Sequence, residues 1–219
     1  GGITDDMLRN CVPVKKDVEA LSSWYQEALY HNMRNLDSLP ADFRDSASPP
    51  PPNSKCLVPC APLAVVKILE HLGVYNPAQP IGAGLIGHSV TILNRSPVVG
   101  KPLAAMLAND GASVYSVDVD SVYAHDRGVD FRVALSPEQA VRQATVLILG
   151  VPLPNFRMPC SWISPGAVVI NVAAQPNICE ESILQVPGVR YVPKIGRMTV
   201  AMLQRNLARL IYNFHLPSA

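Results

Sequence analysis

The sequence predicts an α/β protein built on a Rossmann-like, doubly wound parallel sheet. From residue 85 onward, short apolar runs alternate with stretches of helical periodicity, an alternation that is typical of βαβ units. Two of the runs, residues 146–149 (Val-Leu-Ile-Leu) and 167–171 (Ala-Val-Val-Ile-Asn), are almost continuously apolar. Buried parallel strands have this character because helices cover both of their faces.

The predicted elements follow one another in the order that such a sheet requires. Helix 62–72 comes first, and Gly73 suits its end. The closing helix begins at Thr199, a candidate N-cap, and Arg205 and Arg209 are spaced to lie along a solvated face. Between them we predict strands at residues 89–93, 113–119, 146–149 and 167–171, and helices at residues 102–109 and 137–144.

Composition and charge exclude several classes of protein. The 219 residues carry a formal net charge of +1, so we expect no nucleic-acid partner and no attraction to an acidic membrane surface. Apolar runs fall short of the roughly 20 residues that cross a bilayer. The histidines are scattered and the cysteines lack metal-ligand spacing, which argues against a metal site and fits a reducing compartment. The cysteines are Cys11, Cys56, Cys60, Cys160 and Cys179.

A proline-rich stretch at residues 46–54 contains four consecutive prolines. Such a run favours an extended, solvent-exposed segment. A surface loop and a ligand for an SH3-type domain are both open, and the lack of a second PxxP copy favours the loop.

The segment after the strand at 89–93 has the chemistry of a phosphate site. It lies at the carboxyl end of a strand, where open α/β sheets bind ligands, and the helix start beyond it offers unpaired N–H groups and a partial positive charge. Gly100 permits a close backbone approach, Ser96 can donate its hydroxyl, and Arg95 supplies charge. The GxGxxG fingerprint is absent, so a nucleotide-binding loop and a glycine-bearing structural turn both remain open.

Asp118 lies near the end of the second predicted strand, 18 residues after Gly100. An acidic side chain at this place accepts hydrogen bonds from the ribose hydroxyls of NAD and repels the 2′-phosphate of NADP. The alternative is an ordinary strand-end aspartate.

Four stretches in the same order resemble motifs of the methylenetetrahydrofolate dehydrogenase/cyclohydrolase family. Residues 94–102 (Asn-Arg-Ser-Pro-Val-Val-Gly-Lys-Pro) resemble its Gly-Arg-Ser-x-x-Val-Gly-x-Pro signature. The other three are 16–19 (Lys-Asp-Val-Glu), 59–62 (Pro-Cys-Ala-Pro) and 193–199 (Pro-Lys-Ile-Gly-Arg-Met-Thr). Residues 25–37, with 115–119, look most like the monofunctional NAD-dependent branch known from fungi.

The resemblance implies an NAD site and identifies no catalytic residue. The cofactor-binding positions that it implies are Asn94, Arg95, Ser96, Val99, Gly100, Asp118, Pro152, Ala173, Ala174, Gly196 and Thr199. The resemblance implies that Arg95, Ser96, Val99 and Gly100 hold the pyrophosphate and the adjoining ribose, that Asp118 faces the adenosine ribose, and that the last five line or cover the nicotinamide.

Two residues are implied on the folate side. Glu19 takes the place of a family aspartate near the pterin, and the alternative is a solvated acid on a charged turn. Cys60 lies near the junction of folate and nicotinamide, although a buried structural thiol is the interpretation that its neighbours favour.

The chain also departs from the family pattern. Ala61 replaces a threonine, and Lys194 and Ile195 stand in a glycine-rich turn that is one residue shorter here. The family's amino-terminal Tyr-x-x-x-Lys helix has no counterpart. The chain therefore looks truncated, with only the remnant of a second α/β domain that binds folate.

We accordingly predict three parts: a partial folate-binding domain at 1–74 with helix 62–72 as a bridge, an NAD-binding domain at 75–198, and a returning helix at 199–219. The implied reaction is hydride transfer from 5,10-methylenetetrahydrofolate to NAD, in a cytoplasmic homodimer. The alternatives are an NAD-binding or oligomerisation fragment without catalysis, and a bifunctional NADP-dependent dehydrogenase and cyclohydrolase.

Overall fold

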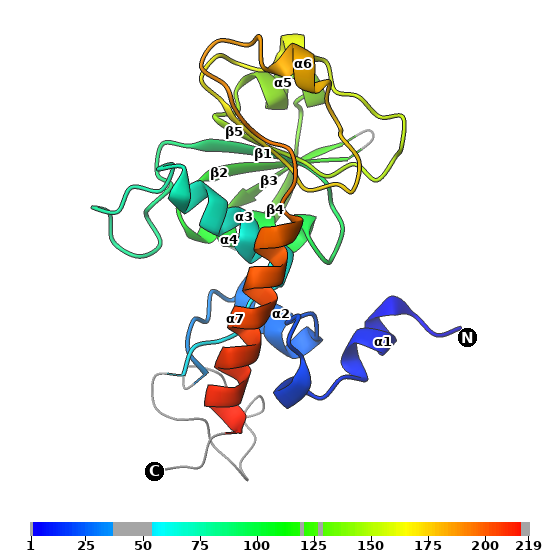
Figure 1. The fold of residues 1–219 in the computed structure, drawn as a ribbon, viewed down its shortest axis with the longest axis vertical. Coiled ribbons are helices and arrows are strands. Elements are labelled where there is room, and N and C mark those ends of the chain that lie inside the picture. The colour runs from blue at the N-terminus through cyan, green and yellow to red at the C-terminus, as the bar shows by residue number, and fades with distance from the viewer. Residues whose placement is uncertain (1, 37–53, 119–120, 127–128, 216–219) are drawn as a thin grey trace.

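The computed structural model describes residues 2–36, 54–118, 121–126 and 129–215 (Figure 1). The prolines of the stretch 46–54 lie outside these ranges, so both interpretations of that stretch stay predictions. A sheet with helices on both faces forms one end of the molecule, and a long carboxyl-terminal helix leads from it toward the amino-terminal helices (Figure 1). Within the described ranges, no helix is both long and apolar enough to cross a membrane.

The sheet contains seven strands. They are β1 Ser89–Leu93, β2 Ser113–Val117, β3 Val122–Asp126, β4 Val129–Val133, β5 Val146–Leu149, β6 Val168–Asn171 and β7 Arg190–Val192. Their order across the sheet is β4-β3-β2-β1-β5-β6-β7. Strands β2, β1, β5, β6 and β7 pair in parallel, whereas β3 pairs antiparallel with both β2 and β4.

The predicted α/β fold is confirmed, with a correction at one edge. Strands β1 and β5 have the predicted bounds, and β2 ends at Val117, short of the predicted residue 119. The β3–β4 hairpin makes the sheet mixed, although a wholly parallel sheet was expected. Most of β4 is exposed, so this edge lacks the apolar run by which buried strands are recognised.

The helices are α1 Asp5–Asn10, α2 Ser23–Tyr30, α3 Cys60–His71, α4 Gly100–Asn109, α5 Pro137–Arg142, α6 Glu180–Ile183 and α7 Gly196–Phe214, with short 3-10 helices at Val14–Lys16 and Cys160–Trp162.

Helices α3 and α4 each begin two residues before the predicted start. The predictions placed Pro62 and Pro102 at the first helical position. Proline also suits the third position, because N–H groups in the first turn have no partner within the helix. Gly73 follows α3 with a φ of 69°, which confirms its predicted role.

Helix α7 begins at Gly196, so the prediction of Thr199 as its N-cap is wrong. The N-cap is Ile195, and the Thr199 hydroxyl donates to the Ile195 carbonyl oxygen at 3.3 Å. Thr199 therefore lies in the first turn, bonded back along the helix.

Two apolar cores lie on opposite faces of the sheet. On one face, α3 and α4 pack against side chains that include Val146 and Ile148 of β5. On the other face, α5 and the last residue of α6, Ile183, pack against Leu147 and Leu149. All four residues of β5 are buried because successive side chains point to opposite faces. This arrangement is what "doubly wound" requires.

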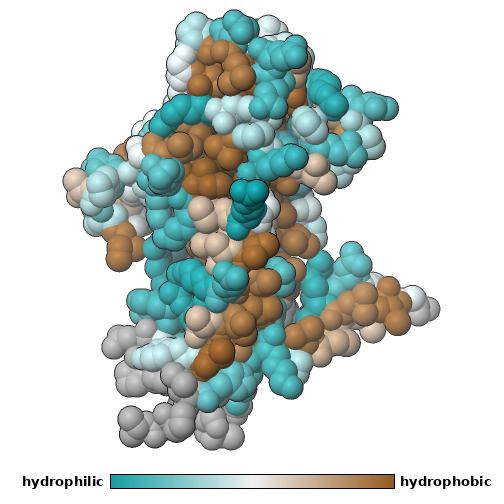
Figure 2. Space-filling view, in the orientation of Figure 1, coloured by the Kyte–Doolittle hydropathy of each residue, from teal (hydrophilic) through white to brown (hydrophobic). Residues whose placement is uncertain are grey.

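The amino-terminal part forms smaller cores with α7. Tyr25 of α2 and Leu57 pack with Leu210 of α7, which also packs along α3. Figure 2 shows apolar side chains on the surface of α1 and α7, where the exposed large residues are Met7, Leu8, Val200, Leu207, Ile211 and Tyr212. The predicted division into parts at residues 74 and 198 stays a prediction.

The two-faced core leads to a stability prediction. Leu147→Ala should lower the free energy of unfolding by about 2–5 kcal/mol, because Leu147 is 1% exposed and its truncation leaves a cavity. Leu153, in the loop after the same strand, is 59% exposed, so Leu153→Ala should stay within about 0.5 kcal/mol. Urea unfolding of both variants measures the difference. Equal losses would contradict the burial described here.

Candidate functional site

The carboxyl ends of the parallel strands meet at one edge of the sheet. Leu93 of β1 is in register with Leu149 of β5, which is in register with Asn171 of β6. The loops that follow these strands therefore lie side by side. They carry most of the predicted cofactor-binding residues, and the site is built from them.

Asn94 ties two of these loops together. Its side-chain Nδ2 donates to the carbonyl oxygen of Gly150 at 2.7 Å, and its Oδ1 accepts from the backbone N–H of Ser96 at 2.7 Å. A Cβ at Gly150 would lie 2.9 Å from Asn94 Cβ, so only glycine leaves room for this side chain. The predicted cofactor role of Asn94 stays a prediction, and its observed contacts fix the loop itself.

Ser96 accepts hydrogen bonds from backbone N–H groups at the start of α4. Its hydroxyl oxygen accepts from the N–H groups of Val99 at 3.1 Å and Gly100 at 3.4 Å, and its carbonyl oxygen accepts from Lys101 at 3.0 Å. The expectation that this helix start offers unpaired N–H groups is therefore wrong for these three amides. The dipole of α4 remains, and a serine oxygen that accepts two hydrogen bonds still carries a hydrogen to donate to an anion.

Gly100 is required by packing. A Cβ at this position would lie 2.0 Å from the carbonyl oxygen of Asn94, a separation that no side chain could adopt. The first residue of α4 thus lies directly against the end of β1, which is one of the known roles of glycine in dinucleotide-binding folds.

Arg95 points toward the antiparallel edge of the sheet. Its guanidinium carbon lies 3.9 Å from the centre of the Tyr123 ring on β3, a cation–π contact. Burial lowers the pKa of His125 on the same strand, the Asp130 carboxylate opposes that shift, and the nearby charge of Arg95 adds to it. Asp118 is exposed just beyond β2, and its N–H donates to Ser121 at 2.9 Å. Arg95 and Asp118 are thus both fixed near the β2–β3 connection.

Two buried asparagines shape the loops on the predicted nicotinamide side, and sequence reasoning missed both. Asn177 accepts from the N–H of Val151 at 2.8 Å and donates to the carbonyl oxygen of the same residue at 3.0 Å. Asn171 donates to the carbonyl oxygens of Ala173, Gln175 and Pro193. The one available signal was the amide that ends the apolar run of β6.

These contacts bring the predicted nicotinamide-side positions together at the carboxyl ends of β5 and β6. Asn177 holds the loop that contains the exposed Pro152, and Asn171 holds Ala173, with Ala174 exposed beside it. The bond from Asn171 to Pro193 also draws the segment before Gly196 toward the end of β6.

The predicted folate-side residues lie at the start of α3. The Sγ of Cys60 is 3.6 Å from the carbonyl oxygen of Val18, and Asn206 of α7 donates to Val18, to Val58 and to that Sγ. Burial, and then the charge of the exposed Glu19, raise the pKa of Cys60 to about 11. A thiol that keeps its proton in this way supports the structural interpretation of Cys60.

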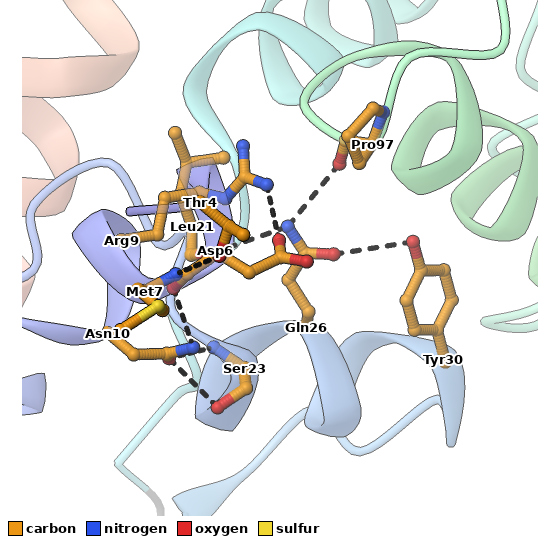
Figure 3. A network of polar contacts seen from close by, with 10 residues as sticks. All are labelled: Thr4, Asp6, Met7, Arg9, Asn10, Leu21, Ser23, Gln26, Tyr30 and Pro97. Carbon is orange, nitrogen blue, oxygen red and sulfur yellow. Dashed lines mark hydrogen bonds and ion pairs between the residues drawn. The ribbon is translucent and has the colours of Figure 1, made fainter. Parts of the chain in front are cut away.

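A side chain from α2 also reaches the loop after β1. The Nε2 of Gln26 donates to the carbonyl oxygen of Pro97 at 3.3 Å, and its Oε1 accepts from the hydroxyl of Tyr30 at 3.4 Å (Figure 3). Nothing in the sequence pattern indicated this contact. It connects the predicted folate-side part to the predicted phosphate loop.

A cavity of about 370 Å³ lies between α2, α3, α4 and α7, away from the strand-end loops. Arg205 and Arg209 line it, so the prediction that both lie on a solvated face is wrong. Burial, and then the charge of Arg205, lower the pKa of Arg209, which donates to the Cys56 carbonyl oxygen at 3.3 Å. Among the residues that the structure describes, no group of three His, Cys, Asp or Glu side chains could hold a metal ion.

Comparison with known proteins relates this geometry to a family. The family described as tetrahydrofolate dehydrogenase/cyclohydrolase, NAD(P)-binding domain, matches residues 59–214. A protein of Dictyostelium discoideum, methylenetetrahydrofolate dehydrogenase (NAD(+)), is 42% identical over 97% of this chain and 66% of its own length. A protein of the same name from Schizosaccharomyces pombe is 42% identical over 94% of this chain and 63% of its own length.

A solved structure agrees with these relatives. The NAD-dependent 5,10-methylenetetrahydrofolate dehydrogenase from Saccharomyces cerevisiae matches with a TM-score of 0.82 and 38% identity, over 96% of this chain and 66% of that one. The chain thus spans less than two thirds of the length of the first two relatives.

The contact between Gly100 and Asn94 can be tested by one methyl group. Gly100→Ala should lower the free energy of unfolding by about 2–3 kcal/mol, because the clash is with backbone that no rotamer can relieve. Gly196→Ala is the matched control: a Cβ there meets nothing within 4 Å, so its effect should stay within about 1 kcal/mol. Urea unfolding measures both. A Gly100 variant as stable as the control would mean that the loop packs differently.

Proposed function

The chain belongs to the tetrahydrofolate dehydrogenase/cyclohydrolase family, and from that premise we propose that it oxidises 5,10-methylenetetrahydrofolate to the methenyl form with NAD as hydride acceptor. The observation that carries the proposal is the match of nearly the whole chain to relatives whose names state this activity and this cofactor. Because the chain spans 66% of the first relative's length, the reaction of the complete protein is part of the proposal.

The residues at the strand ends suit a dinucleotide. We assign the pyrophosphate to the start of α4, where the helix dipole and the Ser96 hydroxyl both favour an anion. Val99 and Gly100 form the adjoining wall. The exposed carboxylate of Asp118, at the end of the next strand, accepts hydrogen bonds from the adenosine ribose.

The nicotinamide is assigned to the neighbouring loops. Pro152, Ala173 and Ala174 line its pocket, and Gly196 and Thr199 cover it from the start of α7. When bound, NAD supplies the hydride acceptor, and the protein supplies orientation and excludes water. Asn171 and Asn177 contribute by fixing the shape of these loops.

The folate side is assigned to the region of Glu19 and Cys60. Glu19 is exposed and could accept a hydrogen bond from the pterin, whereas Cys60 contributes shape through its buried thiol. The proposal includes a homodimer in the cytoplasm.

The activity is tested by following NADH formation. We expect NADH to form from NAD and 5,10-methylenetetrahydrofolate, and none from tetrahydrofolate, which lacks the one-carbon unit to be oxidised. Both the 219-residue chain and the complete gene product should be assayed. If the complete product binds NAD but forms no NADH from 5,10-methylenetetrahydrofolate, a cofactor-binding module without catalysis is the better description. Turnover with NADP alone would favour the bifunctional alternative.

The choice of NAD over NADP is tested at Asp118. Charge-assisted hydrogen bonds to the ribose contribute roughly 1.5–3 kcal/mol, and the 2′-phosphate of NADP would meet the same carboxylate. Asp118→Ser should therefore weaken NAD binding and strengthen NADP binding, as measured by titrating both cofactors. A change in the affinity ratio of less than about threefold, under 1 kcal/mol, would exclude Asp118 as the discriminating residue.

Two further variants sharpen this test. Asp126→Ser removes the same charge at the end of β3, which runs antiparallel and so ends at the opposite edge of the sheet, and it should leave the ratio unchanged. Tyr123→Leu frees Arg95 from its ring contact. Combined with Asp118→Ser, it should raise NADP affinity further, because a released guanidinium can pair with the 2′-phosphate.

A further inference from the structure

Cys160 and Cys179 lie next to each other on the two loops that flank the predicted nicotinamide side. Cys160 begins the 3-10 helix Cys160–Trp162, which follows the loop after β5, and Cys179 precedes α6. The Sγ of Cys160 lies 4.0 Å from the carbonyl oxygen of Cys179. Two cysteines that are 19 residues apart in sequence are therefore in contact.

The two thiols differ in a way that suits consecutive roles in oxidation. Cys179 is exposed just before α6, and the polar groups of Ser182, followed by the backbone of Glu181, lower the pKa of its thiol. Cys160 is half-buried, and burial, followed by the neighbouring Cys179, raises its pKa. Thiolate character and exposure together determine which cysteine is oxidised first. Cys179 is thus the thiol that reacts first with an oxidant, and Cys160 is the neighbouring thiol that reacts afterwards with the oxidised Cys179.

We propose that Cys179 and Cys160 form a peroxide-sensitive pair that closes to a reversible disulfide. The Cys179 thiolate attacks one oxygen of hydrogen peroxide, the O–O bond breaks, and a sulfenic acid forms with loss of hydroxide, which takes up a proton as water. The sulfur of Cys160 then attacks the sulfenic sulfur. The S–S bond forms, the S–O bond breaks, and the departing hydroxide leaves as water with the Cys160 proton. The sulfurs lose two electrons in total and the peroxide gains two.

The disulfide would connect the loop after β5 to the loop after β6. Asn177, two residues before Cys179, already holds the first loop at Val151 and at Met158. A covalent bond at Cys160 would add a second connection beyond that clamp. Its relevance to cofactor binding rests on the proposed function, whereas formation of the bond does not.

Mass spectrometry of the full chain tests the pair. The reduced protein is treated with hydrogen peroxide at high dilution, remaining thiols are blocked with N-ethylmaleimide, and the chain is digested. We expect one cross-linked peptide pair containing Cys160 and Cys179, with loss of maleimide label from both together, reversed by dithiothreitol. The buried Cys60, whose pKa is raised to about 11, is the internal marker for an unreactive thiol.

Single variants separate the two roles. In Cys160→Ala the label on Cys179 should still be lost, now to a sulfenic acid trapped by dimedone, and in Cys179→Ala the Cys160 label should persist. Cys11→Ala, which removes the exposed cysteine at the end of α1, should leave the cross-link unchanged. Circular dichroism checks that each variant folds. Oxidation of Cys11 ahead of Cys179, or wild-type Cys179 that passes to the sulfinic acid without a cross-link, would overturn the proposal. These readouts are independent of NAD binding and turnover.

Discussion

The side chain of Asn94 joins the two central strands of the sheet at their carboxyl ends, and the geometry of the site follows from this junction. Its amide group donates to the carbonyl oxygen of Gly150, just after β5, and accepts from the N–H of Ser96 in its own loop, which turns the chain toward α4. Ser96 then receives the first N–H groups of that helix, while Gly100 and Gly150 leave the space that the junction needs. An anion at this place meets a hydroxyl group and a helix dipole, because the amides are already engaged.

The features that could be predicted from the sequence are those that a local pattern of residues determines. Strands β1 and β5 are central and buried on both faces, so their apolar runs marked their bounds correctly. The β3–β4 hairpin was missed because an exposed edge carries no such run. The motif at residues 94–102 marks the loop where we propose that the pyrophosphate binds, but the hydrogen bonds within that loop could not be predicted from the sequence. Asn177 and Asn206 act on residues far along the chain, and a single sequence without aligned relatives does not show such tertiary partners.

Helix α7 connects the two halves of the structure. The segment just before its first turn is bonded to the end of β6 through Asn171 and Pro193, and farther along the helix Asn206 donates to Val18 and Val58 in the amino-terminal part. Gln26 makes a second connection from α2 to the loop after β1 (Figure 3). The predicted folate-side and cofactor-side residues are therefore joined through hydrogen bonds and one continuous helix. Displacement of α7 would change both sides at once.

The reliance of the strand-end loops on amide side chains has a consequence for their response to acid and base. Asn94, Asn171 and Asn177 each hold backbone groups with donors and acceptors that neither gain nor lose a proton over the pH range of living cells. A histidine or a carboxylate in any of these places would make loop shape a function of proton concentration. With amides, the framework is indifferent to pH. Acidification of the surroundings reaches this edge of the sheet only through groups outside the framework.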